Sequence, residues 1–253
     1  NPKVTVDETT KHVKKYIYRV CFIDPFQGTV AANFAAKDLK VKKAAMLVDN
    51  SSDYSKGLAE FFEAALKKEG GEIVANEAYL QKDTDFKATL TKIKSKGAEV
   101  LYVPGYYEEV GKIVKQAREM GITIPIIGAD GWDSPKLVEI ATATALNNTF
   151  FTNHYSVEDT SPKAKAFVEA YTKEYGQKPE DLAVLGYDAV YVLADAIKRA
   201  NSTDSAKIIE ALAATKDFPA ISGVTTINKT HDADKNAVVI EMKDGKQVFK
   251  TSI

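Results

Sequence analysis

The sequence has little cysteine, no excess of charge and no long apolar run. These absences argue against a disulfide, a nucleic-acid or membrane surface, and a transmembrane helix. Cys21 is the only cysteine, so an intrachain disulfide is impossible. Its apolar neighbourhood, YIYRVCFI, predicts a buried thiol. The formal net charge of −1 gives no support to a nucleic-acid groove or an anionic membrane surface. No apolar run approaches the roughly 18 residues that a transmembrane helix needs.

The motifs of common catalytic and cofactor sites are also missing. No G-x-G-x-x-G follows an apparent strand, so a dinucleotide cofactor is not expected. Neither the phosphate-binding G-x-x-x-x-G-K-[ST] loop nor the G-x-S-x-G nucleophile turn occurs. His12, His154 and His231 lie far apart without metal-ligand spacing, and we expect them to be bystanders. We therefore expect no catalytic residues, no metal and no cofactor, which favours a binding protein over an enzyme.

Strand and helix signals alternate through the first 150 residues. The expected strands are residues 17–22, 43–48, 73–80, 99–103, 124–128 and 148–153. Single amphipathic helices separate most of them, as at Val110, Ile113, Val114 and Ala117. This alternation predicts an α/β fold with a parallel sheet covered on both faces. The later helices are expected at 162–175, 181–200 and 205–214, and Asp244-Gly245 predicts a closing hairpin.

Three of the expected strands end in unusual loops. The loops DNSSDY (49–54), PGYY (104–107) and ADGWD (129–133) carry aromatic residues and acids. Ligands of open α/β sheets bind beyond the carboxyl ends of the strands. A carboxylate beside aromatic walls suits a small cation with apolar character, such as an amino acid. The alternative is ordinary turn and capping chemistry, which Asp133-Ser134-Pro135 in particular predicts for the next helix.

These loops and their surroundings resemble the branched-chain amino acid solute-binding proteins of ABC transporters, which have the periplasmic binding protein type I fold. The resemblance rests on YIYRVCFIDPFQGTVAA, VDNSSDYSKG, GYDAVYVLADAI, the closing hairpin and, above all, the long segment from KDTDFKATL to IPIIGADGWDSP. The resemblance implies two Rossmann-like three-layer α/β/α lobes, joined by a hinge. An amino acid is held in the cleft, and the lobes close over it.

The resemblance also assigns ligand-binding roles. The family's pocket positions correspond to Asp130, Tyr106, Tyr54, Trp132, Tyr187 and Phe26. Asp130 stands where the family places an acid that pairs with the ligand's α-ammonium, and Tyr106 and Tyr54 match pocket tyrosines. For Tyr187 the alternative is helix packing. The family often has Glu at position 130, and the shorter Asp would draw the ammonium closer or favour a differently shaped ligand.

The resemblance predicts a layout in which the first lobe is incomplete. Residues 1–19 would be a remnant of lobe I, residues 20–150 with 236–253 would form lobe II, and residues 151–235 would be the helical part of lobe I. The resemblance implies that the family's N-terminal βαβ segment is missing here, and we expect the first lobe to need that segment, in cis or in trans.

The implied function is capture of an amino acid, with an aliphatic or branched side chain, for delivery to the membrane permease of an ABC importer. Such a protein is bacterial and extracytoplasmic, either in the periplasm or lipid-anchored at the cell surface. One alternative is a ligand-sensing domain of a receptor or regulator with the same fold. A small α/β hydrolase is a third class.

Overall fold

The computed structural model describes residues 1–253 and divides into two compact units. Unit 1 comprises Asn1–Ile23 and Val157–Ala237, and unit 2 comprises Asp24–Ser156 and Val238–Ile253. The chain therefore changes unit after Ile23, Ser156 and Ala237. The expected boundaries were a few residues earlier, after 19, 150 and 235. No helix is both long enough and apolar enough to cross a membrane.

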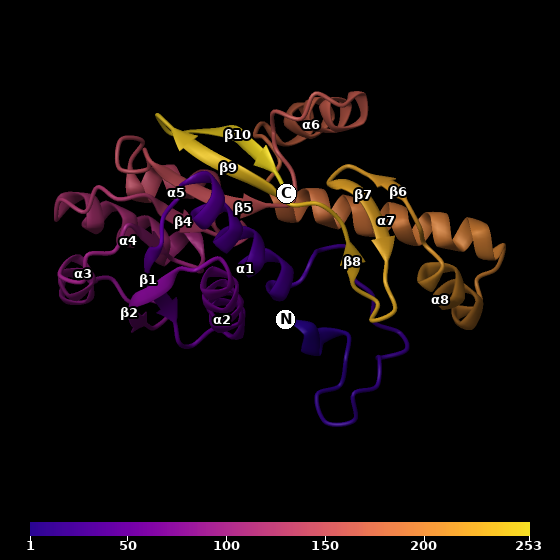
Figure 1. Ribbon diagram of the computed structural model, residues 1–253. Helices are drawn as coiled ribbons and strands as arrows, with labels where there is room; N and C mark the ends of the chain where they lie inside the picture. The colour runs from indigo at the N-terminus through magenta and orange to yellow at the C-terminus, as the bar shows by residue number, and fades with distance from the viewer. The chain divides into compact units, whose positions relative to one another are not determined.

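Unit 2 is built on one seven-stranded sheet with the order β10-β9-β5-β4-β3-β1-β2 (Figure 1). The strands are β1 (Lys43–Asp49), β2 (Glu72–Tyr79), β3 (Val100–Tyr102), β4 (Ile126–Gly128), β5 (Thr149–Asn153), β9 (Val238–Lys243) and β10 (Lys246–Ser252). The first five pair in parallel, as their separation by helices predicts. The closing hairpin adds β9 antiparallel to β5, and β10 to β9, so the sheet is mixed.

Unit 2 has five helices, of which the first precedes β1 and the other four connect successive parallel strands. They are α1 (Asp24–Asn33), which continues into a π-helical turn (Phe34–Asp38), α2 (Asp53–Lys68), α3 (Lys87–Lys94), α4 (Tyr107–Glu119) and α5 (Pro135–Ala141). A short 3-10 turn (Asp130–Trp132) precedes α5. Ser134, rather than Asp133, caps α5 by accepting from the backbone N–H of Lys136, and Pro135 occupies its first turn.

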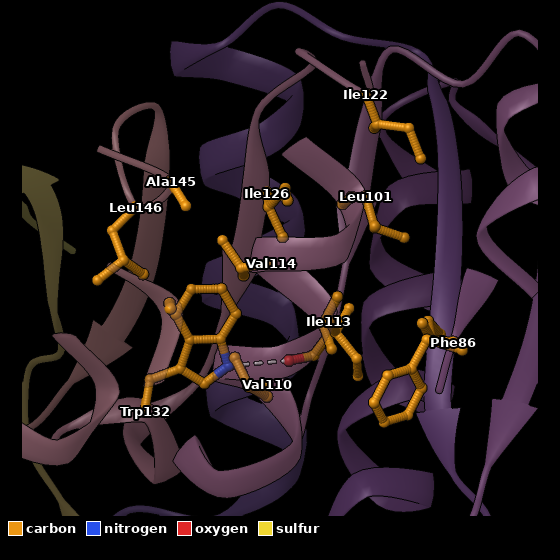
Figure 2. Close-up of a cluster of buried hydrophobic side chains, with 14 of the residues drawn as sticks. Phe86, Leu101, Val110, Ile113, Val114, Ile122, Ile126, Trp132, Ala145 and Leu146 are labelled. Carbon is orange, nitrogen blue, oxygen red and sulfur yellow. Dashed lines mark hydrogen bonds between the residues drawn. The ribbon is translucent and has the colours of Figure 1, made fainter. Parts of the chain in front are cut away.

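A hydrophobic core covers one face of this sheet. Val110, Ile113 and Val114 of α4 pack over Leu101 and Ile126 of the strands, and all five are buried (Figure 2). The spacing of the three α4 residues places them on one side of the helix, which is why the helix buries that side. The core fixes β3, β4 and the helix between them, and hence the loops that follow both strands.

Arg118 holds together the loops at the amino ends of β4 and β5. Its guanidinium donates to five backbone carbonyls, those of Ile122, Ile124, Ala145, Asn147 and Asn148. One planar cation thus satisfies acceptors from two connecting segments. This network lies at the end of the strands opposite to the loops that sequence reasoning selected.

Unit 1 consists mainly of helices and one small sheet. Its helices are α6 (Pro162–Tyr175), α7 (Asp181–Ala200) and α8 (Ser205–Ala213), and its strands are β6 (Phe218–Ala220), β7 (Gly223–Ile227) and β8 (Ala233–Asp234). The N-terminal segment opens with a 3-10 turn (Pro2–Val4). Asp232 ties this segment to the turn before β8, because it accepts from Arg19 Nε at 2.6 Å and from Thr5 Oγ1 at 2.9 Å.

Some sequence predictions about the N-terminal part were wrong. Residues 17–22 form no strand. The Tyr18 ring stacks on His231 with centroids 3.9 Å apart, and the Arg19 N–H donates to the His231 carbonyl, so the segment packs on a turn instead of a sheet. Cys21 is half-buried, not buried. Helix α1 and the small sheet of unit 1 were not predicted.

Candidate functional site

The loops after β1, β3 and β4 bring three of the predicted residues together within unit 2. Tyr54 lies in the first turn of α2, Tyr106 immediately precedes the first residue of α4, and Asp130 follows β4. Because these strands are parallel neighbours, their carboxyl ends lie along the same edge of the sheet.

The Asp130 carboxylate is the centre of this group, and its side chain is 17% exposed. Its Oδ1 accepts hydrogen bonds from the Tyr54 hydroxyl and, at 2.9 Å, from the Gln27 amide. Its Oδ2 lies 3.4 Å from His154 Nε2. Three side chains from α1, α2 and the residue after β5 therefore hold one carboxylate.

An aromatic surface lies beside this carboxylate. The rings of Tyr54 and Tyr106 stack with centroids 5.1 Å apart and an interplanar angle of 27°. Tyr106 is 41% exposed. The Gly131 N–H donates to the Tyr54 hydroxyl at 3.1 Å. A Cβ at Gly131 would lie 2.8 Å from the Gly105 carbonyl oxygen and 2.9 Å from Tyr106 Cδ1, so only glycine lets the two loops approach this closely.

The electrostatics of the site favour a charged carboxylate and a neutral phenol. Burial opposes ionisation, but the interaction with His154 and the hydrogen bonds from Tyr54 and Gln27 outweigh it, and the pKa of Asp130 lies below its ordinary value. Burial and the charge of Asp130 raise the pKa of Tyr54 well above its usual range. Tyr54 therefore remains a hydrogen-bond donor to an ionised Asp130 at neutral pH.

Trp132, which closely follows Asp130 in the chain, lies in the core of unit 2. Trp132 is fully buried, and its indole N–H donates to the Val103 carbonyl at 3.1 Å (Figure 2). Its ring lies against Gly128, where a Cβ would come within 2.0 Å of it. Trp132 is thus a core residue beneath the loop, which corrects the expectation that it lines a cleft. Phe26 is half-buried on α1.

Tyr187 belongs to unit 1. It lies on α7, where its ring is 4.7 Å from that of Phe167 and 4.4 Å from that of Tyr191. Within unit 1 it therefore packs against aromatic neighbours of α6 and α7, which is the alternative that sequence reasoning left open.

Two residues of the site were missed by sequence reasoning. His154 was expected to be a bystander, but it is 2% exposed and lies next to Asp130. Its position directly after the predicted strand 148–153 was a usable signal, because that strand ends at the same edge of the sheet. Gln27 lies in α1, which was not predicted, so nothing in the sequence marked it.

Comparisons with known proteins agree on one family. The family described as "Periplasmic binding protein" matches residues 2–247. The Leu/Ile/Val-binding protein homolog 3 of Brucella melitensis is 33% identical over 249 residues, which are 98% of this chain and 67% of that protein. The Leu/Ile/Val-binding protein BraC3 of Rhizobium johnstonii is 34% identical over 91% of this chain. This chain spans only 62% of the Rhizobium protein.

Two solved structures resemble the chain more strongly. The leucine-binding protein LivK of Thermotoga maritima is 41% identical with a TM-score of 0.92, and the match covers 100% of this chain and 70% of that one. The branched-chain amino acid binding protein LivJ of Streptococcus pneumoniae, solved in complex with isoleucine, is 41% identical with a TM-score of 0.87. That match covers 99% of this chain and 70% of LivJ.

Proposed function

Because the chain belongs to the periplasmic binding protein family, we propose that it captures an amino acid with an aliphatic side chain, through the Asp130 carboxylate of unit 2. The α/β fold and the resemblance to branched-chain amino acid binding proteins, both predicted from the sequence, are confirmed by the family match and by LivK and LivJ. The family consists of solute-binding proteins.

The ionised and largely buried Asp130 is the observation that carries this proposal. Tyr54 and Gln27 are neutral donors, so they hold the carboxylate without cancelling its charge. A buried carboxylate is stabilised by polar and cationic partners, and an ammonium group would join His154 beside Oδ2. The stacked Tyr54 and Tyr106 rings offer an apolar and π-electron surface beside that cation. An amino acid supplies both the cation and the apolar group.

The side-chain preference rests on the relatives. LivJ was solved with isoleucine, and the Brucella and Rhizobium proteins are named for leucine, isoleucine and valine. For this chain we assign the ammonium contact to Asp130, with Tyr54 and Tyr106 shaping the pocket. Phe26 and Tyr187 are proposed as further ligand contacts, and Trp132 as the support beneath the Asp130 loop.

The cellular role follows by analogy with the family. We assign the chain to delivery of the bound amino acid to the membrane permease of an ABC importer, in an extracytoplasmic location that is either periplasmic or lipid-anchored. In this assignment unit 2 corresponds to the second lobe of the family fold and unit 1 to part of the first.

Replacing the carboxylate tests the proposal. Asp130→Asn keeps the shape but leaves the ligand's ammonium without its counter-charge, which costs ~2–5 kcal/mol, or roughly 30-fold or more in affinity. Isothermal calorimetry with L-leucine, L-isoleucine and L-valine measures this. Asp204→Asn is the matched control, since the Asp204 side chain accepts from the Lys207 N–H at the start of α8 and takes no part in the Asp130 group. Unchanged affinity in Asp130→Asn would remove Asp130 from the site.

A further inference from the structure

Gln27 connects Asp130 to the sheet. Its side chain is buried at 2% exposure, and its amide nitrogen donates to Asp130 Oδ1 at 2.9 Å and to Thr152 Oγ1 at 3.0 Å. An amide nitrogen has two hydrogens, so both are used. Gln27 thus bridges the loop after β4 and the adjacent strand β5.

This bridge limits the orientation of the carboxylate. The terminal torsion of an aspartate is broad, so an unsupported carboxylate can turn. In this site both the Tyr54 hydroxyl and the Gln27 amide bind Oδ1, which fills that oxygen with two donors from two helices. Oδ2 is left on the side of His154. The oxygen that can still take a strong donor is therefore Oδ2.

The two donors are also fixed relative to each other. Gln27 lies on α1 and Tyr54 on α2, and these helices pack directly at Gly28. A Cβ on Gly28 would lie 2.8 Å from the Leu58 carbonyl oxygen. The same close contact therefore fixes the backbones from which the two donors extend.

We propose that Gln27 is a positioning residue that holds the Asp130 carboxylate so that Oδ2 receives the ligand's ammonium group. This inference rests on the proposed function. A carboxylate that is already held in place loses less conformational entropy when the ligand binds. Gln27 therefore affects affinity only by orienting Asp130.

A double-mutant cycle tests the positioning role. Gln27→Met has a similar volume but no amide, and we expect it to weaken L-leucine binding roughly tenfold in calorimetry, the upper end of what one hydrogen bond contributes. In an Asp130→Asn background the same change is expected to alter affinity less than twofold. Gln116→Met is the matched control, because the Gln116 amide binds the Phe86 N–H and the Thr84 carbonyl away from the site. It is expected to leave affinity unchanged.

The outcomes separate the two proposals. Wild-type affinity in a folded Gln27→Met, or an equal loss in both backgrounds, would overturn the positioning role while leaving Asp130 as the ammonium partner. Unchanged affinity in Asp130→Asn alone would overturn the proposed function itself. If Gln27→Met does not fold, the isosteric Thr152→Val decides: it removes the second anchor of Gln27, and we expect a two- to threefold loss. No loss there would contradict the inference.

Discussion

Lys235 places an ammonium group in the interior of unit 1, at 9% exposure. Its Nζ donates to Ser222 Oγ, and Ser222 Oγ donates to Asp188 Oδ2 at 2.6 Å. Burial lowers the pKa of Lys235 from 10.5 to about 8, although Asp188, Cys21 and Asp181 act in the opposite direction. The fold therefore tolerates a charge that its surroundings only partly compensate.

This residue predicts a specific pH dependence of stability. Because the unfolded state binds the Lys235 proton more tightly, the cost of the buried charge is fully present below pH 8 and disappears as the pH rises toward 10.5. Relative to Lys235→Met, the wild-type free energy of unfolding should rise by about 2 kcal/mol between roughly pH 7.5 and 9.5. Guanidinium denaturation at the two pH values measures it, with the exposed Lys207→Met as control. Parallel pH profiles of wild type and Lys235→Met would contradict the prediction.

The proximity of Asp130, Tyr54 and Tyr106 could be predicted from chain position. Each lies in the loop or first turn that follows a parallel strand, and the carboxyl ends of these strands lie along one edge of the sheet. Gln27 reaches Asp130 only through the tertiary packing of α1, which no local pattern encodes. Trp132 failed as a pocket residue because its indole found a partner in the core, at the Val103 carbonyl.

The contact between α1 and α2 is the element-scale feature on which the site depends. At Gly28 an added Cβ would lie 2.8 Å from the Leu58 carbonyl oxygen and 2.9 Å from Phe61 Cβ, and both are too close. Gln27 and Tyr54, one on each helix, donate to the same oxygen of Asp130. Helices α1 and α2 lie side by side (Figure 1), so their contact sets the separation of the backbones that carry the two donors.

Gly28→Ala should damage both stability and binding. Overpacking at this helix contact is expected to lower the free energy of unfolding by ~1–3 kcal/mol, less any gain in helix propensity, and to weaken L-leucine binding. Urea denaturation and calorimetry measure the two effects. Gly186→Ala is the matched control, because it lies inside α7 with nothing within 4 Å of the added Cβ. It should be neutral or stabilising by ~0.5–1 kcal/mol. Equal behaviour of the two variants would refute the packing argument.

Among the elements, those with one apolar stripe could be predicted and those buried on several sides could not. Helices α2 and α4 show helical spacing of apolar residues, and both were predicted. Helix α1 has buried residues on several faces, including Gln27 and Gly28, so no polar stripe marks it. Residues 17–22 have strand-like composition, yet they pack on the His231 turn, because tertiary contacts override propensity.

For the whole molecule, each unit combines segments that are distant in sequence. Unit 2 needs residues 238–253 to complete its sheet, since β9 pairs with β5. Unit 1 needs its first 23 residues, since Arg19 and Thr5 bind Asp232. The closing hairpin could be predicted because Asp-Gly fixes it locally. The three-stranded sheet of unit 1 could not, because its strands are two to five residues long and carry little pattern.

Separate interiors predict separate unfolding transitions in scanning calorimetry. Asp188→Ala should lower only the transition of unit 1. Asp188 accepts from the Ile221 and Ser222 N–H groups, and its loss leaves those donors and the Lys235 charge uncompensated within a buried cluster. Gly28→Ala should lower only the transition of unit 2, by ~2–4 °C per kcal/mol for a unit of this size. If both variants shifted the same single transition, the two units would unfold as one cooperative structure. The two units defined by their internal contacts would then not be independent units of unfolding.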